Sequence, residues 1–151
     1  MKKQSVRLFS ALLLAVLLQP GCATNRARPE AAQAPVSVSG QELIKTTRSW
    51  DGSPLPAYPR GQPEITIKRI TIPAGARLET HSHPVINAGI LLSGELTVVK
   101  ADGQTLQLAA GDPIVELVNQ PHYGINRGKV PAVIVVIYSG AANTPVTVIG
   151  Q

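Results

Sequence analysis

Short apolar segments separated by glycine and proline turns constrain the fold of this chain more than any other feature. The 151 residues include 13 glycines and 13 prolines, which supply turn signals throughout the sequence. Aromatic residues make up only 3% of the chain, so the core must be built from valine, isoleucine and leucine, which favour strands. No helical period appears after Gly40. The sequence therefore predicts an all-β domain of roughly nine or ten short strands, arranged as a sandwich, jelly roll or barrel.

The alternation of apolar residues places the expected strands between these turns. Ile65 and Ile67 share one face of their segment. Ile70 and Ile72 share the other face, and this change of phase predicts a β-bulge or bend at residues 68–69. We expect strands at residues 42–48, 64–72, 77–83, 85–92, 96–100, 105–108, 114–118, 130–138 and 144–149.

The first 21 residues have the organisation of an export signal. Three basic residues, Lys2, Lys3 and Arg7, precede an apolar run at residues 9–18. That run is too short to span a bilayer comfortably as a permanent helix. Without those three charges the formal net charge falls from +5 to +2, with 11 basic against 9 acidic residues, and the basic residues do not cluster. A nucleic-acid partner is therefore not expected.

Cys22 directly follows this segment and, as the only cysteine, has no partner for an internal disulfide. Residues 1–22 resemble a bacterial lipoprotein signal, in which a cysteine after a small residue is lipidated and becomes the new N-terminus. Gly21 fits that pattern, whereas Gln19 and Pro20 depart from it. The resemblance implies a membrane anchor through lipid on Cys22 and, because Ala23 is not aspartate, an outer-membrane protein that faces the periplasm. The alternative is a simple secretory signal cleaved nearby, which leaves a free thiol.

The remaining chain divides into a tether and one folded domain. Residues 22–40 are rich in alanine, proline, serine and glutamine and show no apolar period, which is typical of a flexible linker. The length leaves room for one domain and a tail, so we expect the folded domain at residues 41–151.

Three histidines, the only ones in the chain, are the strongest candidates for a functional site. His81 and His83 are one residue apart, so they point to the same face if their segment is a strand. His122 follows a proline turn in a later segment, and all three imidazoles converge if the strands close on one another. Neutral imidazole suits zinc, iron, nickel and copper. The alternative is that the His-x-His pair is a surface feature without function.

The spacing around these histidines resembles the cupin family over about fifty residues. Gly75, five residues, His81-Ser82-His83 and a gap to Gly94 match the first cupin motif. Gly111-Asp112, then His122, three residues and Asn126 match much of the second motif. The resemblance implies a single-domain barrel of the double-stranded β-helix (jelly-roll) type, with a metal or ligand site inside it. It also implies that His81, His83 and His122 are metal ligands.

The same resemblance exposes one departure at the fourth ligand position. The glutamate that is usual there, seven residues before Gly94, is replaced by Asn87. Asn87 has the strand parity to point inward with the histidines, but its amide oxygen is a weaker donor. Leu117 and Asn119 also stand where proline and glycine are usual. The metal is therefore expected to be divalent, with iron slightly favoured over manganese, zinc and nickel.

Glu116 is the candidate catalytic residue. It shares a face with Ile114 and Val118 in an apolar segment, where an unpaired carboxylate is costly. It is expected to act as a ligand, as a general base, or as an acceptor that orients a histidine. The alternatives are an ion pair with a buried arginine and an outward-facing position on an edge strand.

These features support two main functional hypotheses. The first is an envelope-anchored metal-binding cupin that carries out an oxygen-dependent oxidation of a small organic substrate; isomerase or lyase chemistry ranks lower. The second is a non-catalytic module that binds or senses a metal or small ligand at the cell envelope, which is favoured if Glu116 faces solvent. Cupins often pair, so a homodimer that uses the run at residues 130–137 is also expected.

Overall fold

The computed structural model describes residues 37–150, and these contain nine β-strands and no helix. The all-β prediction is therefore confirmed. Within the described residues, no helix has the length and apolar character that a membrane crossing requires. The strands are β1 (Pro63–Ile72), β2 (His81–Ser82), β3 (Ile86–Ser93), β4 (Glu95–Lys100), β5 (Thr105–Ala109), β6 (Pro113–Val115), β7 (His122–Ile125), β8 (Ala132–Ala141) and β9 (Val148–Ile149).

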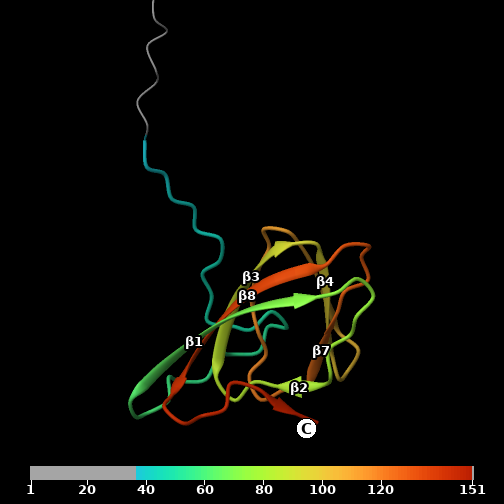
Figure 1. Cartoon of the computed structure of the whole chain (residues 1–151). Coiled ribbons are helices and arrows are strands. Elements are labelled where there is room, and N and C mark those ends of the chain that lie inside the picture. The colour runs from blue at the N-terminus through green and yellow to red at the C-terminus, as the bar shows by residue number, and fades with distance from the viewer. Residues whose placement is uncertain (1–36, 151) are drawn as a thin grey trace, which may run out of the picture. The chain divides into compact units, whose positions relative to one another are not determined.

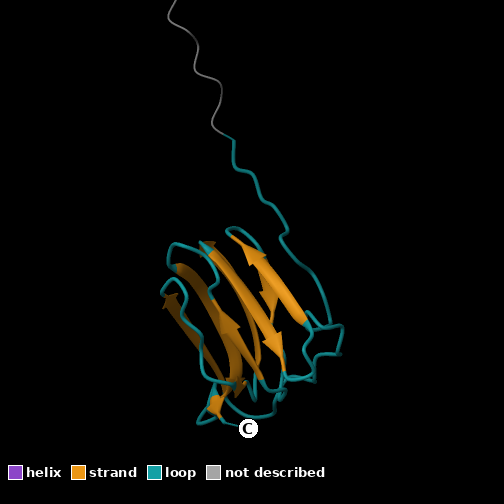
Figure 2. Ribbon diagram, turned by 90° about the vertical axis from the view of Figure 1, so that its right-hand side faces the viewer, coloured by secondary structure: helices purple, strands orange, loops and turns teal. Residues whose placement is uncertain are grey.

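The nine strands form two antiparallel sheets. One sheet has the order β1-β8-β3-β6 and the other has the order β5-β4-β7-β2-β9. Figure 1 shows β1 and β8 running side by side, with β4 and β7 on the other side of the domain. Turned by 90°, the strands appear as two facing layers (Figure 2). This is the jelly-roll arrangement, in which the two inner sheet faces enclose the core.

β1 is regular, so the predicted bulge at residues 68–69 is wrong. All ten of its residues pair with β8 without a change of register. The side chains of Lys68, Ile70 and Ile72 therefore share the inner face, because alternate residues of a strand point the same way. Ile65 and Ile67 lie on the outer face, where they remain 58% and 65% exposed. The apparent change of phase arises because both faces of this strand carry isoleucine.

The expected strand at residues 42–48 is also absent. Leu43 and Ile44 are about half exposed, and the only pairing there is a single bridge between Arg48 and Pro54. Local alternation does not make a strand when the segment has no partner for its backbone groups. Three further strands are shorter than expected, since the segments at residues 77–83, 114–118 and 144–149 form strands only at residues 81–82, 113–115 and 148–149. Arg77 adds a single isolated bridge to Ile125.

The core lies between the two sheets and is mainly aliphatic. The compact unit that contains it begins at Ser39. The predicted signal segment, Cys22 and most of the predicted tether lie outside the described residues. The buried core cluster consists of Ile72, Val85, Leu91, Leu96, Val98, Leu108, Ile114, Ala132, Ile134, Val136 and Tyr138.

Candidate metal centre

The three histidines converge inside the domain, as the sequence predicted. His81 on β2 lies directly opposite His122 on β7 in the antiparallel pair, and His83 follows two residues after His81 on the same face. The three ring centroids are 4.7 to 5.1 Å apart. One nitrogen from each ring lies within 4.8 Å of the other two, a spacing that can hold a metal ion. Pairing between β2 and β7 is therefore the step that assembles the cluster.

A backbone carbonyl fixes the orientation of each imidazole. The Nδ1 atom of His81 lies 2.7 Å from the Glu79 carbonyl oxygen, and Nδ1 of His122 lies 2.9 Å from that of Gln120. Nδ1 of His83 lies 2.7 Å from the carbonyl oxygen of Val146. Because a carbonyl can only accept a hydrogen bond, each Nδ1 carries the hydrogen, and each Nε2 keeps its lone pair. This is the tautomer in which Nε2 binds a metal.

Two imidazoles of the cluster favour the uncharged state that metal binding needs. Burial, with smaller contributions from His122 and His81, lowers the pKa of His83 to about 4, although the hydrogen bond to Val146 acts in the opposite direction. Burial also lowers the pKa of His122, with a smaller contribution from His81. The Nε2 atom of His122 is buried and has no hydrogen-bond partner in the described structure. A buried nitrogen acceptor is costly without a partner, so these donors fit a divalent metal ion.

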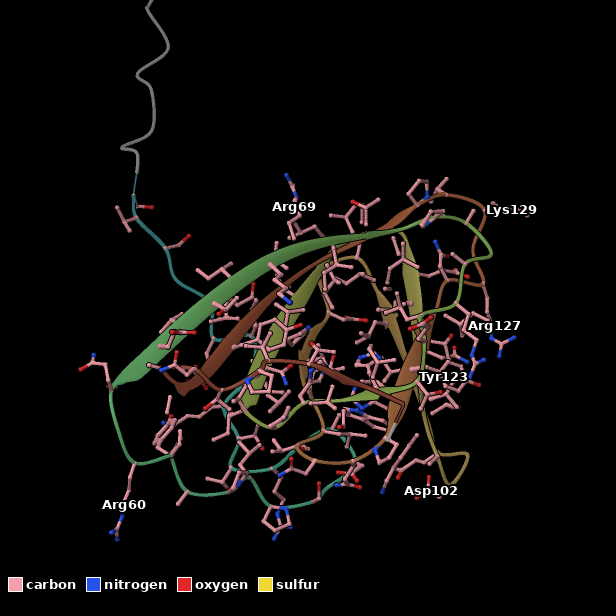
Figure 3. All side chains as sticks on the ribbon, turned by 60° about the horizontal axis from the view of Figure 1, so that its bottom comes forward. Arg60, Arg69, Asp102, Tyr123, Arg127 and Lys129 are labelled. Atoms are coloured by element: carbon pink, nitrogen blue, oxygen red, sulfur yellow. The ribbon has the colours of Figure 1, made fainter. Side chains whose placement is uncertain are left out.

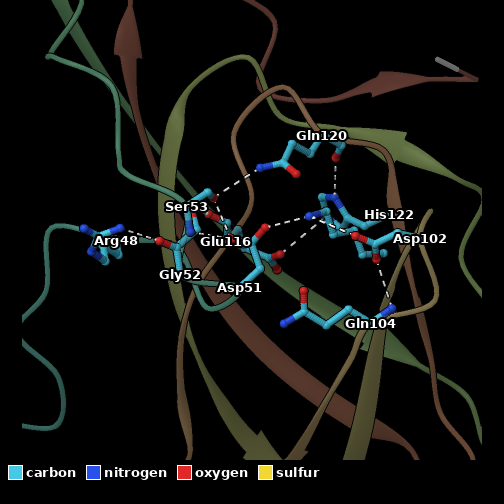
Figure 4. A network of polar contacts seen from close by, with 11 residues as sticks. Arg48, Asp51, Gly52, Ser53, Asp102, Gln104, Glu116, Gln120 and His122 are labelled. Atoms are coloured by element: carbon cyan, nitrogen blue, oxygen red, sulfur yellow. Dashed lines mark hydrogen bonds and ion pairs between the residues drawn. The ribbon is translucent and has the colours of Figure 1, made fainter.

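Glu116 faces the interior beside this cluster. Its side chain lies in the segment after β6 and one carboxylate oxygen, Oε2, is 3.4 Å from Nε2 of His122. The residue is 8% exposed, and burial raises the pKa of its carboxyl to about 7. Its backbone is held on both sides, since its N–H donates to the Asn87 carbonyl and its own carbonyl accepts from the Ser49 hydroxyl. Figure 4 shows Glu116 and His122 close to the loop that carries Asp51 and Ser53.

The cluster opens into a cavity of about 270 Å³ between the two sheets. Since one water molecule occupies about 30 Å³ of liquid, the space corresponds to roughly nine waters, enough for a small organic molecule. Eight of the lining residues are aliphatic and eight carry polar side chains. The lining residues are Lys68, Ile70, Ile72, Leu78, Glu79, His81, His83, Leu96, Val98, Glu116, His122, Gly124, Ile134, Val136, Tyr138, Thr147 and Ile149.

Comparison with known proteins agrees with this architecture. Residues 68–138 match the family model of the cupin domain. The fold is that of the cupins. The match spans β1 to β8 and contains all three histidines and Glu116. No curated protein matches the sequence at a significant level.

Several solved structures share the cupin fold at low sequence identity. A double-stranded β-helix protein from Klebsiella pneumoniae is 21% identical with a TM-score of 0.50, over 74% of this chain and 99% of that one. The DMSP lyase DddQ from Ruegeria pomeroyi is 21% identical with a TM-score of 0.51, over 66% of this chain and 49% of that one. A structure from the set of DMSP lyases RdDddP and RnDddQII is 18% identical with a TM-score of 0.51, over 58% of this chain and 44% of that one. The match thus spans less than half of either lyase, and the likeness shows the fold alone.

Asn87, the residue at the fourth cupin ligand position, lies near the cluster without lining the cavity. It is on β3 and is 1% exposed, with the inward orientation that strand parity predicted. Its amide nitrogen donates weakly to the Val85 carbonyl at 3.4 Å, and its Oδ1 atom has no partner in the described structure. Of the two candidates, Glu116 and not Asn87 presents an oxygen to the cavity.

Asn126, the last residue of the second cupin motif, has a structural role. It is completely buried, and its amide nitrogen donates to the carbonyls of Ile72 and Val130. Its oxygen accepts from the Gly128 N–H. These bonds tie the end of β1 to the turn before β8. Tyr123, which directly follows His122, packs against the Arg77 guanidinium 3.8 Å from its ring and points away from the cavity (Figure 3).

Four polar residues that line the cavity were missed from the sequence, namely Lys68, Glu79, Tyr138 and Thr147. Tyr138 on β8 packs its ring 5.4 Å from that of His83, and its hydroxyl bonds to Thr147. Lys68 on β1 lies with its amine 5.5 Å from the centre of the Tyr138 ring. Lys68 could have been predicted to face inward, because it lies two and four residues before Ile70 and Ile72 on the same strand. The wrongly expected bulge at residues 68–69 broke that alternation.

Proposed function

We propose that this protein is a cupin that binds one divalent metal ion through His81, His83 and His122 and catalyses the oxidation of a small organic substrate by oxygen. The observation that carries the proposal is the convergence of three imidazoles, each with its Nδ1 hydrogen bonded to a carbonyl and its Nε2 free. Nitrogen donors of this kind suit iron, manganese, zinc and nickel, and we favour iron.

The ion, when bound, supplies Lewis-acid and redox chemistry. The protein's own groups provide the rest. The three backbone carbonyls hold the imidazoles in one orientation, and the aliphatic part of the wall packs against the substrate. Glu116 takes up or releases a proton at Oε2. Its pKa of about 7 suits that task, because a general acid or base works best when its pKa is near the working pH.

The buried position of Glu116 supports an enzyme over a purely binding module. A site that only sequesters a metal has no need for an unpaired carboxylic acid in an aliphatic cavity, where the group is costly. Isomerase and lyase reactions also use such a proton-transferring group, so they remain the next reaction classes to test. A non-catalytic sensor is the alternative function, and it predicts metal binding without turnover.

Metal analysis tests the centre. Purified protein is offered iron, zinc, manganese and nickel in turn, and bound metal is measured by elemental analysis. We expect close to one ion per chain, and loss of that ion in the His81→Ala/His122→Ala variant. Tyr123→Phe is the matched control, since Tyr123 neighbours His122 but points away from the cavity. No bound metal in the wild-type protein for all four ions refutes the proposed centre.

Oxygen uptake separates the enzyme from the sensor. Iron-loaded protein is mixed with a panel of small organic acids and alcohols in an oxygen electrode, beside the Glu116→Gln variant. We expect uptake with at least one compound and a loss of uptake in Glu116→Gln, with the metal content unchanged. Metal binding without uptake for any compound supports the non-catalytic alternative.

We also propose that the protein is exported and lipid-anchored through Cys22 at the outer membrane, facing the periplasm. The basic start, the apolar run at residues 9–18 and the small residue before the only cysteine support this. In cells fed a labelled fatty acid, the wild-type protein is expected to carry the label and Cys22→Ser is not. An unlabelled wild-type protein found only in the soluble fraction contradicts the proposal.

A further inference from the structure

Lys68 is the one side chain of fixed positive charge among the residues that line the cavity. It comes from the inner face of β1, between Thr66 and Ile70, and the other inner positions from Ile70 on line the cavity with aliphatic groups. Lys68 itself is exposed, so its amine stands where the cavity meets solvent. A charged group at this position is available to a ligand that enters the cavity.

Lys68 has no charged partner in the described part of the chain. The two lysine ion pairs found there both belong to Lys100, and Lys68 makes no hydrogen bond or ion pair with a described residue. Its amine instead lies over the ring of Tyr138, at 5.5 Å from the ring centre. A cation over an aromatic face is stabilised only modestly, and all three of its hydrogen-bond donors stay available.

The amine also stands close to the metal centre. The Tyr138 ring beneath it lies against His83, with 5.4 Å between the ring centroids. Thr147 bonds to the Tyr138 hydroxyl, and its own hydroxyl lies 3.4 Å from Nδ1 of His83. One aromatic ring thus separates the free cation from the histidines. A small molecule in the cavity reaches both, since the space holds roughly nine waters.

We propose that the substrate is a small carboxylate, whose carboxyl group Lys68 binds at one end of the cavity while its reacting part lies at the histidine cluster. The inference rests on the proposed function, which makes the histidine cluster the reacting site, and it adds the substrate class. Charge-assisted bonds from the amine hold the carboxylate, and the aliphatic walls pack against its short chain. Glu79 also lines the cavity, and its carboxylate repels negative charge on a ligand. The ligand is therefore expected to carry a single acid group, on the side of Lys68.

The test uses butanoate, the uncharged butanamide and butylammonium as probes of matched size. Binding to the purified protein, metal-free and zinc-loaded, is measured by NMR titration. The variants are Lys68→Met and Lys68→Arg. Arg69→Met is the matched control, because it removes the same charge from the next residue of β1, whose side chain points away from the barrel (Figure 3). Thermal unfolding of each variant shows whether it folds, and Lys68→Gln serves if Lys68→Met does not.

We expect wild-type protein to bind butanoate about tenfold more tightly than butanamide, the ratio that one charge-assisted hydrogen bond gives. Neutral substitution of Lys68 should abolish the preference, whereas Lys68→Arg and Arg69→Met should keep it. Equal affinity for butanoate and butanamide in the wild type, or a preference that survives in Lys68→Met, overturns the inference. Tighter binding of butylammonium also overturns it, because Glu79 then selects the ligand.

The metal content of the same samples keeps this inference separate from the proposed function. A preference for butanoate that depends on Lys68 in protein that takes up no metal supports the carboxylate site and refutes the metal centre. Full metal loading without that preference supports the metal centre and refutes the carboxylate site.

Discussion

Two glycines of the first cupin motif give a matched pair for testing how the motif stabilises the fold. Gly75 and Gly94 both have a φ of +75°, which alanine adopts only with strain. Their surroundings differ. A Cβ atom on Gly75 would meet nothing within 4 Å, whereas one on Gly94 would lie 2.7 Å from the Pro131 carbonyl oxygen and 2.8 Å from the Ala132 Cα. Gly94 thus lets the turn between β3 and β4 touch the start of β8.

The structure gives a different cost for each substitution. Gly75→Ala is destabilised only by the strain of the left-handed conformation. The net cost is about 1 kcal/mol, because the alanine chain also has less entropy to lose on folding. Gly94→Ala has the same strain, and the backbone of the neighbouring strand must also move away. Overpacking of this kind typically costs a further 1–3 kcal/mol, so we expect a total of about 3 kcal/mol.

Urea unfolding of the two purified variants measures this difference. With a denaturant dependence of about 1.5 kcal/mol per molar, Gly75→Ala should lower the midpoint by less than about 1 M and Gly94→Ala by about 2 M. Wild-type protein in the same buffer is the reference. If Gly94→Ala proves no less stable than Gly75→Ala, the close contact with the start of β8 does not limit the residue at this turn, and the argument fails.

Three more predictions concern the loop, the second motif and the metal. Burial would raise the pKa of Asp51, but hydrogen bonds from Ser53 and Lys100 outweigh it and lower the pKa to about 2. Its stabilisation is therefore present above pH 3.8 and is lost as the pH falls through 2. Asp51→Asn should cost about 1 kcal/mol at pH 7, and this cost should shrink as the pH falls from 3.8 through 2 in thermal unfolding; a constant difference contradicts this. Asn126→Ala should lower the unfolding free energy in urea by about 2–4 kcal/mol, because one buried and two partly buried backbone groups lose their partner; a loss below about 1 kcal/mol contradicts this. Zinc at 100 times its dissociation constant should stabilise the protein by about 2.7 kcal/mol, reversibly with EDTA, and should leave His122→Ala unchanged; an equal rise in melting temperature in the variant refutes the centre.

The failed strand predictions share one physical cause. The segment at residues 42–48 alternates as a strand should, yet it lies outside both sheets and its apolar side chains remain half exposed. The isoleucines of β1 looked like a bulge because each face of the segment carries a pair of them. Local alternation reports which residues share a face, but it does not report whether a partner strand exists or which face is covered.

Of the polar residues in the cavity, Glu116 was recognised from the sequence, whereas Lys68 was placed only by the fold. Glu116 was recognised because a lone carboxylate in an apolar segment is conspicuous, but its distance of 3.4 Å from His122 and its pKa of about 7 follow from burial in the folded domain. Lys68 has nothing unusual in its local sequence, which also contains Arg69. Only the continuous register of β1 on β8 turns one of these two cations toward the cavity and the other toward solvent.

The sequence by itself determined the all-β class, the turns at its glycines and the shared face of His81 and His83. These depend on backbone sterics and on the two-residue repeat of a strand, which act between near neighbours. The tertiary structure decided that His122 lies opposite His81, that three backbone carbonyls orient the imidazoles, and that Lys68 and Glu116 reach the same cavity. These depend on the register between strands far apart in the chain, which is set by the packing of both sheets around one core.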